Sequence, residues 1–292
     1  AASVQRITEE VIFHVLRYVH KQTGLDKVCI AGGVAQNSVA NGKITRNTPF
    51  KGVFIPSAGH DAGISMGAAY WVHHHQAQQA RSETVMQACT GSQFTNEEII
   101  AVCKELNLNY KQVEEATIFD YVATRLAAGK VVGWFNGRAE FGPRALGGRS
   151  ILADPRRDDA KELLNLKIKR RESFRPFAPS ILKEQVSQWF ELDEPVPFME
   201  KVFPIRKEKQ AQIPAVTHAD GSGRLQTVDK KVSERYYKLI DAFYQQTKVP
   251  ILLNTSFNEN EPIVNAPEEA IRCYLRTDMD MLVMQNIILE RN

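Results

Sequence analysis

The stretch Gly137-Arg-Ala-Glu-Phe-Gly-Pro-Arg-Ala-Leu-Gly-Gly-Arg-Ser150 decides how the rest of the chain is interpreted. It follows an apolar run, residues 131–135, so we expect a buried strand to end here and a surface loop to begin. Its four glycines allow the backbone to approach a ligand closely. Its guanidinium groups, which suit phosphate and carboxylate, belong to Arg138, Arg144 and Arg149. The stretch therefore predicts an anion-binding loop.

Basic residues are concentrated in one window around this loop. Residues 137–175 hold eleven Lys and Arg against six Asp and Glu, a net charge of +5, whereas the whole chain has a net charge of +3. This focusing favours a small polyanionic ligand over a general coating for nucleic acid. A solvated basic loop and helix face is the more frequent explanation of a charge run. Here the glycines and the sequence Arg175-Pro-Phe-Ala-Pro179 favour the ligand site.

Composition limits the class of protein. The chain has 292 residues, enough for two domains, and its 43% hydrophobic and 24% charged residues are typical of a soluble globular protein. No apolar run approaches the roughly 20 residues that span a bilayer. The four cysteines form no C-x-x-C pair, so we expect buried thiols rather than zinc knuckles or disulfides. These features predict a cytoplasmic protein without a membrane partner.

The first 80 residues predict alternating helices and short strands. An amphipathic helix with a stripe of valines is predicted over residues 1–22, and Gly24 should end it. A buried strand is predicted at 27–31 and a second strand at 52–55, with helices at 38–43 and 64–69. Because Ala1 opens directly into a helical pattern without a methionine, we expect the chain to be part of a longer protein.

Glycine-rich turns follow both predicted strands. Gly32, Gly33 and Asn37 lie in the first turn, where the amides of a following helix would face a phosphate. Close packing of strand and helix explains paired glycines equally well. Asp61 lies in the second turn, where it could bind a metal or cap the next helix, and the sequence slightly favours the cap.

A polar segment, residues 76–96, marks the predicted domain boundary. The remainder mixes helices and strands, so we expect an α/β fold. Helices are predicted at 96–106, 116–128, 158–169 and 233–246, and from residue 267. Strands or extended segments are predicted at 131–135, 174–182, 249–253 and 281–289.

Five motifs occur together and in order. They are Gly32-Gly-Val-Ala-Gln-Asn37, Pro56-Ser-Ala-Gly-His-Asp61, the Gly137–Ser150 stretch, Phe174-Arg-Pro-Phe-Ala-Pro-Ser180 and Leu253-Asn-Thr-Ser-Phe-Asn258. With them the chain resembles, over nearly its whole length, the C-terminal half of NodU/CmcH-type O-carbamoyltransferases. The resemblance implies that residues 1–80 are the last portion of an actin-like (ASKHA) domain. It implies that residues 85–292 form a YrdC-like domain built on a twisted α/β sheet.

The resemblance also implies a reaction. Enzymes of this type use ATP and carbamoyl phosphate to make carbamoyl adenylate and pyrophosphate, and then pass the carbamoyl group to a hydroxyl of a small-molecule acceptor. The catalytic positions carried over are Lys169, Arg175, Arg144 and Ser256. The positions expected to bind substrate or nucleotide are Arg138, Arg224, Asn254, Gly32, Gly33 and Asn37. Several negative oxygens meet in such a reaction, so positioning and charge stabilisation are the catalytic need.

A metal site is implied as well. Similar enzymes hold a divalent metal (Fe, Mn or Zn) on a His-x-x-x-His pair and aspartates, and use Mg²⁺ with ATP. Asp61 matches one of these aspartates, but the sequence has no His-x-x-x-His, because His14 and His20 are six apart and residues 73–75 are contiguous histidines. We therefore expect an incomplete metal site and partial activity at best.

Two alternatives stay open. The first is an enzyme that makes threonylcarbamoyl adenylate for tRNA modification. The second is a nucleotide- or RNA-binding module, in which Phe141, Phe174 and Phe177 would stack on bases, although the modest net charge makes a nucleic-acid partner the weaker choice. We expect these three phenylalanines to pack on the core instead, and Glu140 to orient an arginine.

Overall fold

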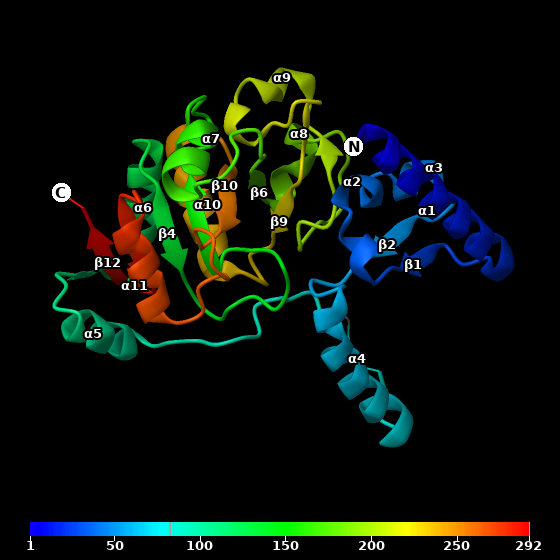
Figure 1. Cartoon of the computed structure of the whole chain (residues 1–292), viewed down its shortest axis with the longest axis horizontal. Helices are drawn as coiled ribbons and strands as arrows, with labels where there is room; N and C mark the ends of the chain where they lie inside the picture. Colours follow the sequence, from blue (N-terminus) through cyan, green and yellow to red (C-terminus); the bar gives the residue numbers. More distant parts are fainter. Residues whose placement is uncertain (82, 84, 292) are drawn as a thin grey trace.

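The computed structural model describes residues 1–81, 83 and 85–291, without the side chain of residue 167. The chain has two parts, connected through residues 77–95 (Figure 1). In the first part, the parallel strands β1 (Lys27–Cys29) and β2 (Gly52–Phe54) form a two-stranded sheet. Around it lie helices α1 (Ala2–Thr23), α2 (Ser38–Asn41) and α3 (Ile44–Asn47), whereas α4 (Ile64–Trp71) projects away from the sheet (Figure 1).

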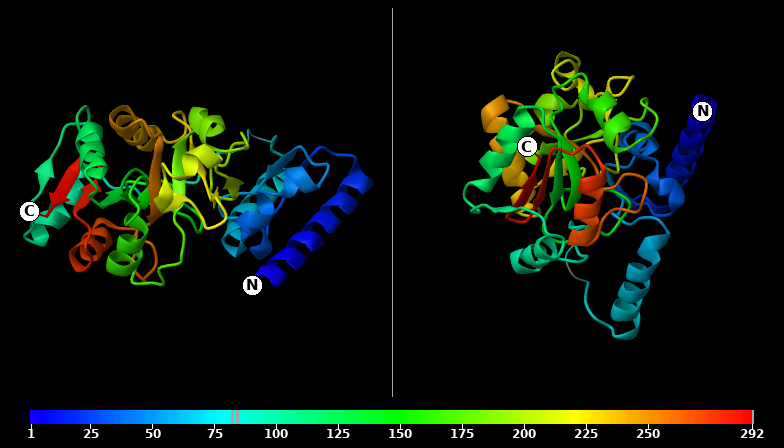
Figure 2. Two further views of the ribbon diagram at one scale, coloured as in Figure 1. Left: turned by 90° about the horizontal axis from the view of Figure 1, so that it is seen from above. Right: turned by 60° about the vertical axis from the view of Figure 1, so that its left-hand side comes forward.

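Helix α1 has the predicted length but not the predicted buried face. Gly24 ends it in the left-handed conformation, with φ of 64°, as its position predicts. The valine stripe is exposed, however, since Val4 and Val11 retain 69% and 56% of their surface. The helix packs instead through Phe13 and Leu16. Figure 2 shows α1 on the outer side of the first part, away from the rest of the chain.

Strand β1 is less buried than predicted. The side chains of Lys27 and Cys29 in β1 are exposed, and every residue of β2 is half-buried. The expectation of a buried strand at 27–31, and of a buried thiol at Cys29, was therefore wrong. A sheet of two strands buries little of its surface by itself.

The second part is built on one eight-stranded mixed sheet, with strand order β3-β12-β11-β4-β5-β10-β6-β9. Only the β11–β4 and β6–β9 pairs are parallel among these neighbours. The strands are β3 (Lys111–Gln112), β4 (Val132–Phe135), β5 (Arg149–Ala153), β6 (Ala178–Leu182), β9 (Gln226–Val228), β10 (Ile251–Ser256), β11 (Met281–Met284) and β12 (Ile287–Glu290). A small antiparallel pair, β7 (Phe203–Pro204) with β8 (Ser222–Gly223), lies beside it. The mixed α/β class predicted from the sequence is confirmed.

Helices cover both faces of this sheet. They are α5 (Asn96–Glu105), α6 (Ile118–Ala127), α7 (Ala160–Leu163), α8 (Val186–Trp189), α9 (Lys207–Gln210), α10 (Glu234–Thr247) and α11 (Pro267–Arg276). In Figure 1, α11 lies in front of the strands and α10 behind them. Thr95 caps α5 through a capping box with Glu98, which explains why the predicted start of this helix is right.

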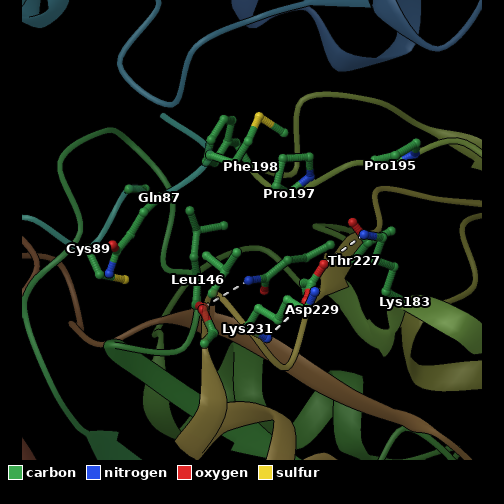
Figure 3. A pocket seen from close by; sticks show the side chains of 15 residues that line it. Gln87, Cys89, Leu146, Lys183, Pro195, Pro197, Phe198, Thr227, Asp229 and Lys231 are labelled. Carbon is green, nitrogen blue, oxygen red and sulfur yellow. Dashed lines mark hydrogen bonds and ion pairs between the residues drawn. The ribbon is translucent and has the colours of Figure 1, made fainter. Parts of the chain in front are cut away.

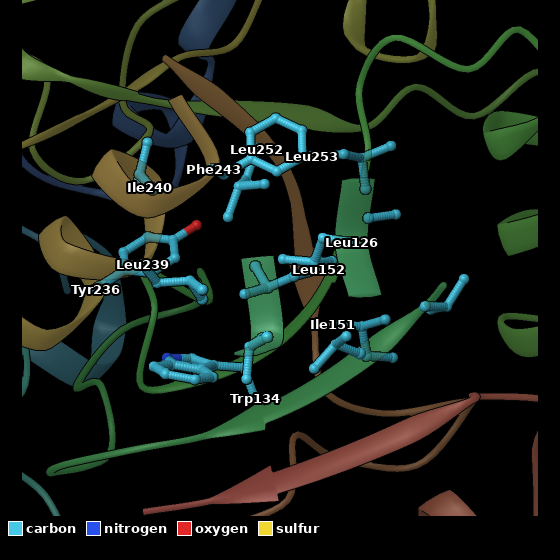
Figure 4. Close-up of a cluster of buried hydrophobic side chains, with 14 of the residues drawn as sticks. Leu126, Trp134, Ile151, Leu152, Tyr236, Leu239, Ile240, Phe243, Leu252 and Leu253 are labelled. Atoms are coloured by element: carbon cyan, nitrogen blue, oxygen red, sulfur yellow. The ribbon is translucent and has the colours of Figure 1, made fainter. Parts of the chain in front are cut away.

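The main core lies between the sheet and the α6–α10 pair. Figure 4 shows Trp134 and Leu152 of the sheet facing Leu239 and Phe243 of α10. All four of these side chains are fully buried. This core fixes the strand ends from which the loop of residues 136–148 projects.

Two predicted elements differ in the structure. The single strand expected over 281–289 is the hairpin β11–β12, because Gln285 adopts φ of 50° and turns the chain. The helix expected over 158–169 is the short α7 followed by one π-helical turn, Leu164–Ile168. That turn brings Lys169 into the interior, where it is only 3% exposed.

Among the helices that the structure describes, none has both the length and the apolar character needed to cross a membrane.

Candidate active site

Glu140 shapes the loop between β4 and β5. Its Oε1 accepts hydrogen bonds from the backbone N–H groups of Leu146 (2.7 Å), Gly148 (2.7 Å) and Arg149 (3.2 Å). One carboxylate oxygen therefore closes the loop across nine residues. Glu140 orients the backbone that carries the arginines rather than an arginine side chain.

Arg149 belongs to this scaffold and not to a ligand site. Its guanidinium stacks on the ring of Phe135 at 3.6 Å from the centroid. It donates to the carbonyl oxygens of Gly148 (3.0 Å) and Ser92 (3.0 Å), and also to those of Asn136 and Gly137. Burial lowers its pKa to about 10. The prediction that Arg149 offers its charge to an anion was therefore wrong.

Arg144, from the same loop, lines a different space. It meets Arg171 and Arg224 around a cavity of about 120 Å³, whose wall also contains Asn254 and Ser256. The other lining residues are Pro143, Ala145, Pro176, Phe177, Ala178, Met199 and Thr255. We call this space the arginine cavity. Its volume is about that of four water molecules in the liquid, so it suits a group of the size of a phosphate.

The arginine cavity concentrates positive charge. Within the described residues, no carboxylate forms an ion pair with Arg144, Arg171 or Arg224. Burial lowers the pKa of Arg224 to about 9, and repulsion from the other two arginines adds to this effect. Burial also lowers the pKa of Arg144. A bound anion would relieve both effects.

Arg171 is held in place by its neighbours. Its Nε donates to Oδ1 of Asn165 at 2.7 Å, and its guanidinium lies 4.9 Å from the ring centroid of Phe177. The predicted site did not include Arg171, although it stands in the basic run of the sequence. The signal that could have found it is its place two residues after Lys169.

Lys169 and Ser256 lie together, beside the cavity. The Lys169 Nζ donates to the carbonyl oxygen (2.6 Å) and Oγ (3.1 Å) of Ser256, and to Oδ1 (2.7 Å) and the carbonyl oxygen (2.8 Å) of Asn258. Burial, with a smaller effect of Arg171, lowers the Lys169 pKa to about 7. Ser256 lines the arginine cavity, so the lysine reaches that cavity through the serine.

Asn254 is the innermost polar residue of the arginine cavity, at 2% exposure. Its Nδ2 donates to Ser180 Oγ (3.0 Å), the Ala145 carbonyl oxygen (3.2 Å) and Gln226 Oε1 (3.2 Å). The structure therefore brings together five of the predicted positions, which are Arg144, Arg224, Asn254, Ser256 and, through Ser256, Lys169.

Family models match both parts of the chain. Residues 123–291, more than half of the chain, match the model described as the carbamoyltransferase C-terminus, and residues 1–70 match the carbamoyltransferase N-terminus. The chain belongs to the carbamoyltransferase family. The resemblance found in the five motifs is thereby confirmed.

Several proteins resemble this carbamoyltransferase-family chain over all of its residues. An uncharacterized protein of Synechocystis sp. is 45% identical over 318 residues, which cover 100% of this chain and 52% of that protein. Nodulation protein NolO of Bradyrhizobium diazoefficiens is 43% identical, over 100% of this chain and 54% of that protein. Nodulation protein NolNO of Sinorhizobium fredii is 42% identical, over 100% and 44%. The chain thus spans about half the length of the curated relatives it matches.

Among solved structures, the chain resembles one described as full-length HypF in the phosphate- and nucleotide-bound form. It aligns with a TM-score of 0.41 and 18% identity, over 63% of this chain and 23% of that one.

Arg175 and Arg138 lie outside the arginine cavity of this family member. Arg175 is about half exposed and pairs with Glu172 at 3.4 Å. Arg138 is exposed, donates to the Thr90 carbonyl oxygen at 3.3 Å, and lines a separate cavity of about 270 Å³ beside Gly147 and Arg235. Their assigned roles stay predictions, and they need a ligand or a side-chain movement that brings them to the site.

The glycine-rich turn that follows β1 also does not line the arginine cavity. Gly32 takes φ of 107° and donates its N–H to the Gly59 carbonyl oxygen. Asn37 caps α2, since its Oδ1 accepts from the Ala40 N–H at 3.1 Å, and its amide pairs with Gln5. The space around the Cβ position of Gly33 is open. Nucleotide binding by Gly32, Gly33 and Asn37 stays a prediction.

Asp61 begins a 3-10 helix, Asp61–Gly63, and its side chain is exposed. In the described residues, no group of three His, Cys, Asp or Glu side chains is arranged to hold a metal. The neighbouring His60 has a buried Nδ1 without a hydrogen-bond partner within these residues, but a single nitrogen does not make a site. The described residues therefore do not form a complete metal centre.

A third cavity is lined in part by Leu146 of the loop. It has a volume of about 270 Å³. Figure 3 shows Pro197 and Phe198 on one side of it and Leu146, Asp229 and Lys231 on the other. Leu146 lies one residue from Ala145 of the arginine cavity, so the loop separates the two spaces.

Of the three phenylalanines in the basic window, only Phe177 packs in the core, at 2% exposure. Phe174 is 75% exposed, so the expectation of a buried ring there was wrong. One exposed ring offers little surface for a stack of bases.

Proposed function

We propose that this chain carries the site at which carbamoyl phosphate and ATP are converted to carbamoyl adenylate, as part of an O-carbamoyltransferase. The observation that carries the proposal is the arginine cavity. Three guanidinium groups, all with lowered pKa values caused mainly by burial, surround a space of phosphate size. Arginine binds phosphate oxygens with paired N–H donors, and here the donors are already in position.

The proposed reaction has two steps. Water converts carbamoyl phosphate to carbamate and phosphate. A carbamate oxygen then attacks the α-phosphorus of ATP, and pyrophosphate leaves. Both steps bring negatively charged oxygens together, so the barrier falls when fixed positive charges surround them. Arg144, Arg171 and Arg224 supply these charges.

Lys169 and Ser256 complete the site. The Ser256 Oγ accepts from the Lys169 Nζ, and its hydroxyl donates to Asn258 Oδ1 at 2.7 Å, so it donates to a phosphate or carbamoyl oxygen in the cavity once it turns away from Asn258. With a pKa of about 7, Lys169 gains or loses a proton near neutral pH. It can therefore adjust the charge of the site when anions bind.

Transfer of the carbamoyl group to a hydroxyl of a small-molecule acceptor would require the remainder of the protein. The first part of the chain lacks a complete metal centre among its described residues. We therefore assign the activation step to this chain and the transfer step to the longer protein. Full carbamoylation of an acceptor by residues 1–292 alone would contradict this division.

The test is ATP–pyrophosphate exchange. We expect the chain to incorporate labelled pyrophosphate into ATP only when carbamoyl phosphate is present. Arg144→Met should remove the exchange, whereas Arg206→Met, which changes a half-buried arginine outside the cavity that donates to the Ser187 carbonyl oxygen, should not. Exchange that needs threonine and bicarbonate instead would favour the tRNA-modification alternative and overturn the proposal.

A further inference from the structure

Met199 forms part of the wall of the arginine cavity from an unusual backbone conformation. Its side chain is 3% exposed, lines the cavity and belongs to the same small buried cluster as Leu146 and Ala178. Its φ is 56°, in the left-handed region that residues other than glycine seldom adopt. The Glu200 side chain closes the turn, because its Oε2 accepts from the Phe198 N–H at 2.8 Å. Such a conformation persists only where the surrounding structure holds it.

The first part of the chain holds this turn through one buried amide. Asn41, in α2, is 3% exposed, and its Nδ2 donates to the carbonyl oxygens of Glu200 (3.0 Å) and Ala35 (2.7 Å). Two carbonyl acceptors require the NH₂ group on this side, so the orientation of the amide is fixed. Ala35 belongs to the 3-10 helix Gly33–Gln36, which follows β1. One side chain therefore joins a turn of the first part to the residue beside Met199.

Two further hydrogen bonds cross the same junction. The Val202 N–H donates to the Ser38 carbonyl oxygen in α2 at 2.9 Å. Thr45, in α3, donates through its Oγ1 to Glu194 Oε1 at 3.0 Å. The segment that carries Met199 is therefore tied to α2 and α3 on both sides of the turn. Movement of these helices would move the segment, and with it one wall of the arginine cavity.

We propose that Asn41 is a positioning residue for the arginine cavity, which holds the Glu200 carbonyl, thereby fixes the Met199 wall, and so sets the affinity of the cavity for a phosphate group. The inference rests on the proposed function, because it takes this cavity as the anion site. All residues that line the cavity belong to the second part of the chain. The first part thus contributes to the activation site without lining it. In a space of only about 120 Å³, a wall displaced by about 1 Å changes the fit of such a group.

Binding of inorganic phosphate tests this role without requiring the reaction. Isothermal titration would compare the wild-type chain with Asn41→Leu, Asn47→Leu and Arg224→Met. We expect Asn41→Leu to bind phosphate about tenfold more weakly, and Arg224→Met to lose the binding. Asn47→Leu is the matched control, because it removes an exposed amide of α3 that donates to the Lys43 carbonyl oxygen. Its affinity should stay within about twofold of the wild type.

A double-mutant cycle separates positioning from a general loss of stability. Met199→Ala shortens the wall without removing a hydrogen bond of Asn41, and it should itself weaken phosphate binding. If Asn41 acts through Met199, adding Asn41→Leu to Met199→Ala should lower the affinity by less than about twofold more. Independent effects would instead add.

The outcomes separate this inference from the proposed function. An Asn41→Leu chain that unfolds more easily but binds phosphate as the wild type does would leave Asn41 a structural role only, and additive losses in the cycle would also overturn the inference. Unchanged affinity in Met199→Ala would overturn it even if Asn41→Leu did not fold. A wild-type chain that binds no phosphate, or an Arg224→Met chain that binds it equally well, would overturn the anion site and both proposals.

Discussion

Arg149 is buried and Arg224 is half-buried, and the Nε atoms of both are enclosed without a partner among the described residues, yet their surroundings differ in kind. Arg149 donates to four carbonyl oxygens and stacks on Phe135. Arg224 faces two other guanidinium groups. Burial lowers the pKa of both, to about 10 and about 9. One charge is satisfied by the fold, and the other is left for a ligand.

The difference shows why a motif does not define a site. Arg144 and Arg149 stand five residues apart in one loop, and either could bind phosphate in principle. Glu140 closes the loop between them and thereby turns Arg149 toward backbone carbonyls and Arg144 toward the arginine cavity. The number of protein acceptors around each guanidinium distinguishes a structural arginine from a binding one.

The largest effect is expected for Arg149→Met. The change leaves four carbonyl oxygens without their donor and should lower the free energy of unfolding by about 3–5 kcal/mol. Urea denaturation measures this loss. Arg149→Lys keeps the charge but not the planar fork, so it should recover only a minor part. A loss below about 1 kcal/mol would show that Arg149 is not part of the scaffold.

Arg224→Met should reduce activity without reducing stability, the opposite of what is expected for Arg149→Met. It removes a charge placed for the ligand, so carbamoyl-phosphate-dependent exchange should fall by at least about 100-fold. The free energy of unfolding should stay the same or increase, because an unpaired buried charge is replaced by an apolar side chain. Both quantities are measured on one preparation. An Arg224→Met chain that unfolds as readily as Arg149→Met would erase the distinction between the two arginines.

Lys169 represents a third arrangement, a buried cation that can lose its proton. Its pKa is about 7 in the folded chain and 10.5 in its ordinary state. Between these values the unfolded chain binds more protons, so the free energy of unfolding rises as the pH rises from about 7 to about 10.5. Below pH 7 both states are protonated and the full destabilisation is present. Thermal unfolding between pH 7 and 10 should therefore show a flatter profile for Lys169→Met. Lys104→Met, at an exposed position, should keep the wild-type slope.

The smallest effects are expected for Arg175→Ala and Arg138→Gln. Both side chains lie outside the arginine cavity, so stability should change by less than about 0.5 kcal/mol. If their positions are the same in the working enzyme, exchange should change by less than about threefold. A loss as large as that of Arg224→Met would show that the side chain moves into the site when ligands bind, and would restore its predicted role.

Local signals in the sequence predicted most of the elements. Thr95 and Gly24 mark helix ends through their own backbone and side-chain chemistry, so these boundaries needed no tertiary information. The turn at Gln285 was missed because it contains neither glycine nor proline. The α1 valines follow a helical period, but a period does not say which face meets the core.

The candidate site was predicted only in part, because residue types and their order are visible in the sequence but side-chain contacts are not. Side chains at the ends of β10 and in the basic loop could be recognised from their types and order, and Arg144, Asn254 and Ser256 do line one cavity. The separation of Arg144 from Arg149 and the inclusion of Arg171 depend on Glu140 and Asn165, whose contacts are set by the folded chain. Hydrogen bonds of this kind, between residues apart in the chain, cannot be recognised from residue types in a single sequence.

Two glycines join the first part of the chain to the second by direct backbone contact. A Cβ atom on Gly42 would lie 2.0 Å from the Val202 carbonyl oxygen, and one on Gly142 would lie 2.5 Å from that of Ser57. Gly142 also takes φ of 145°. Chimeras that exchange the first part between relatives should therefore fold only when both glycines are kept. A side chain at either position would push the two backbones apart.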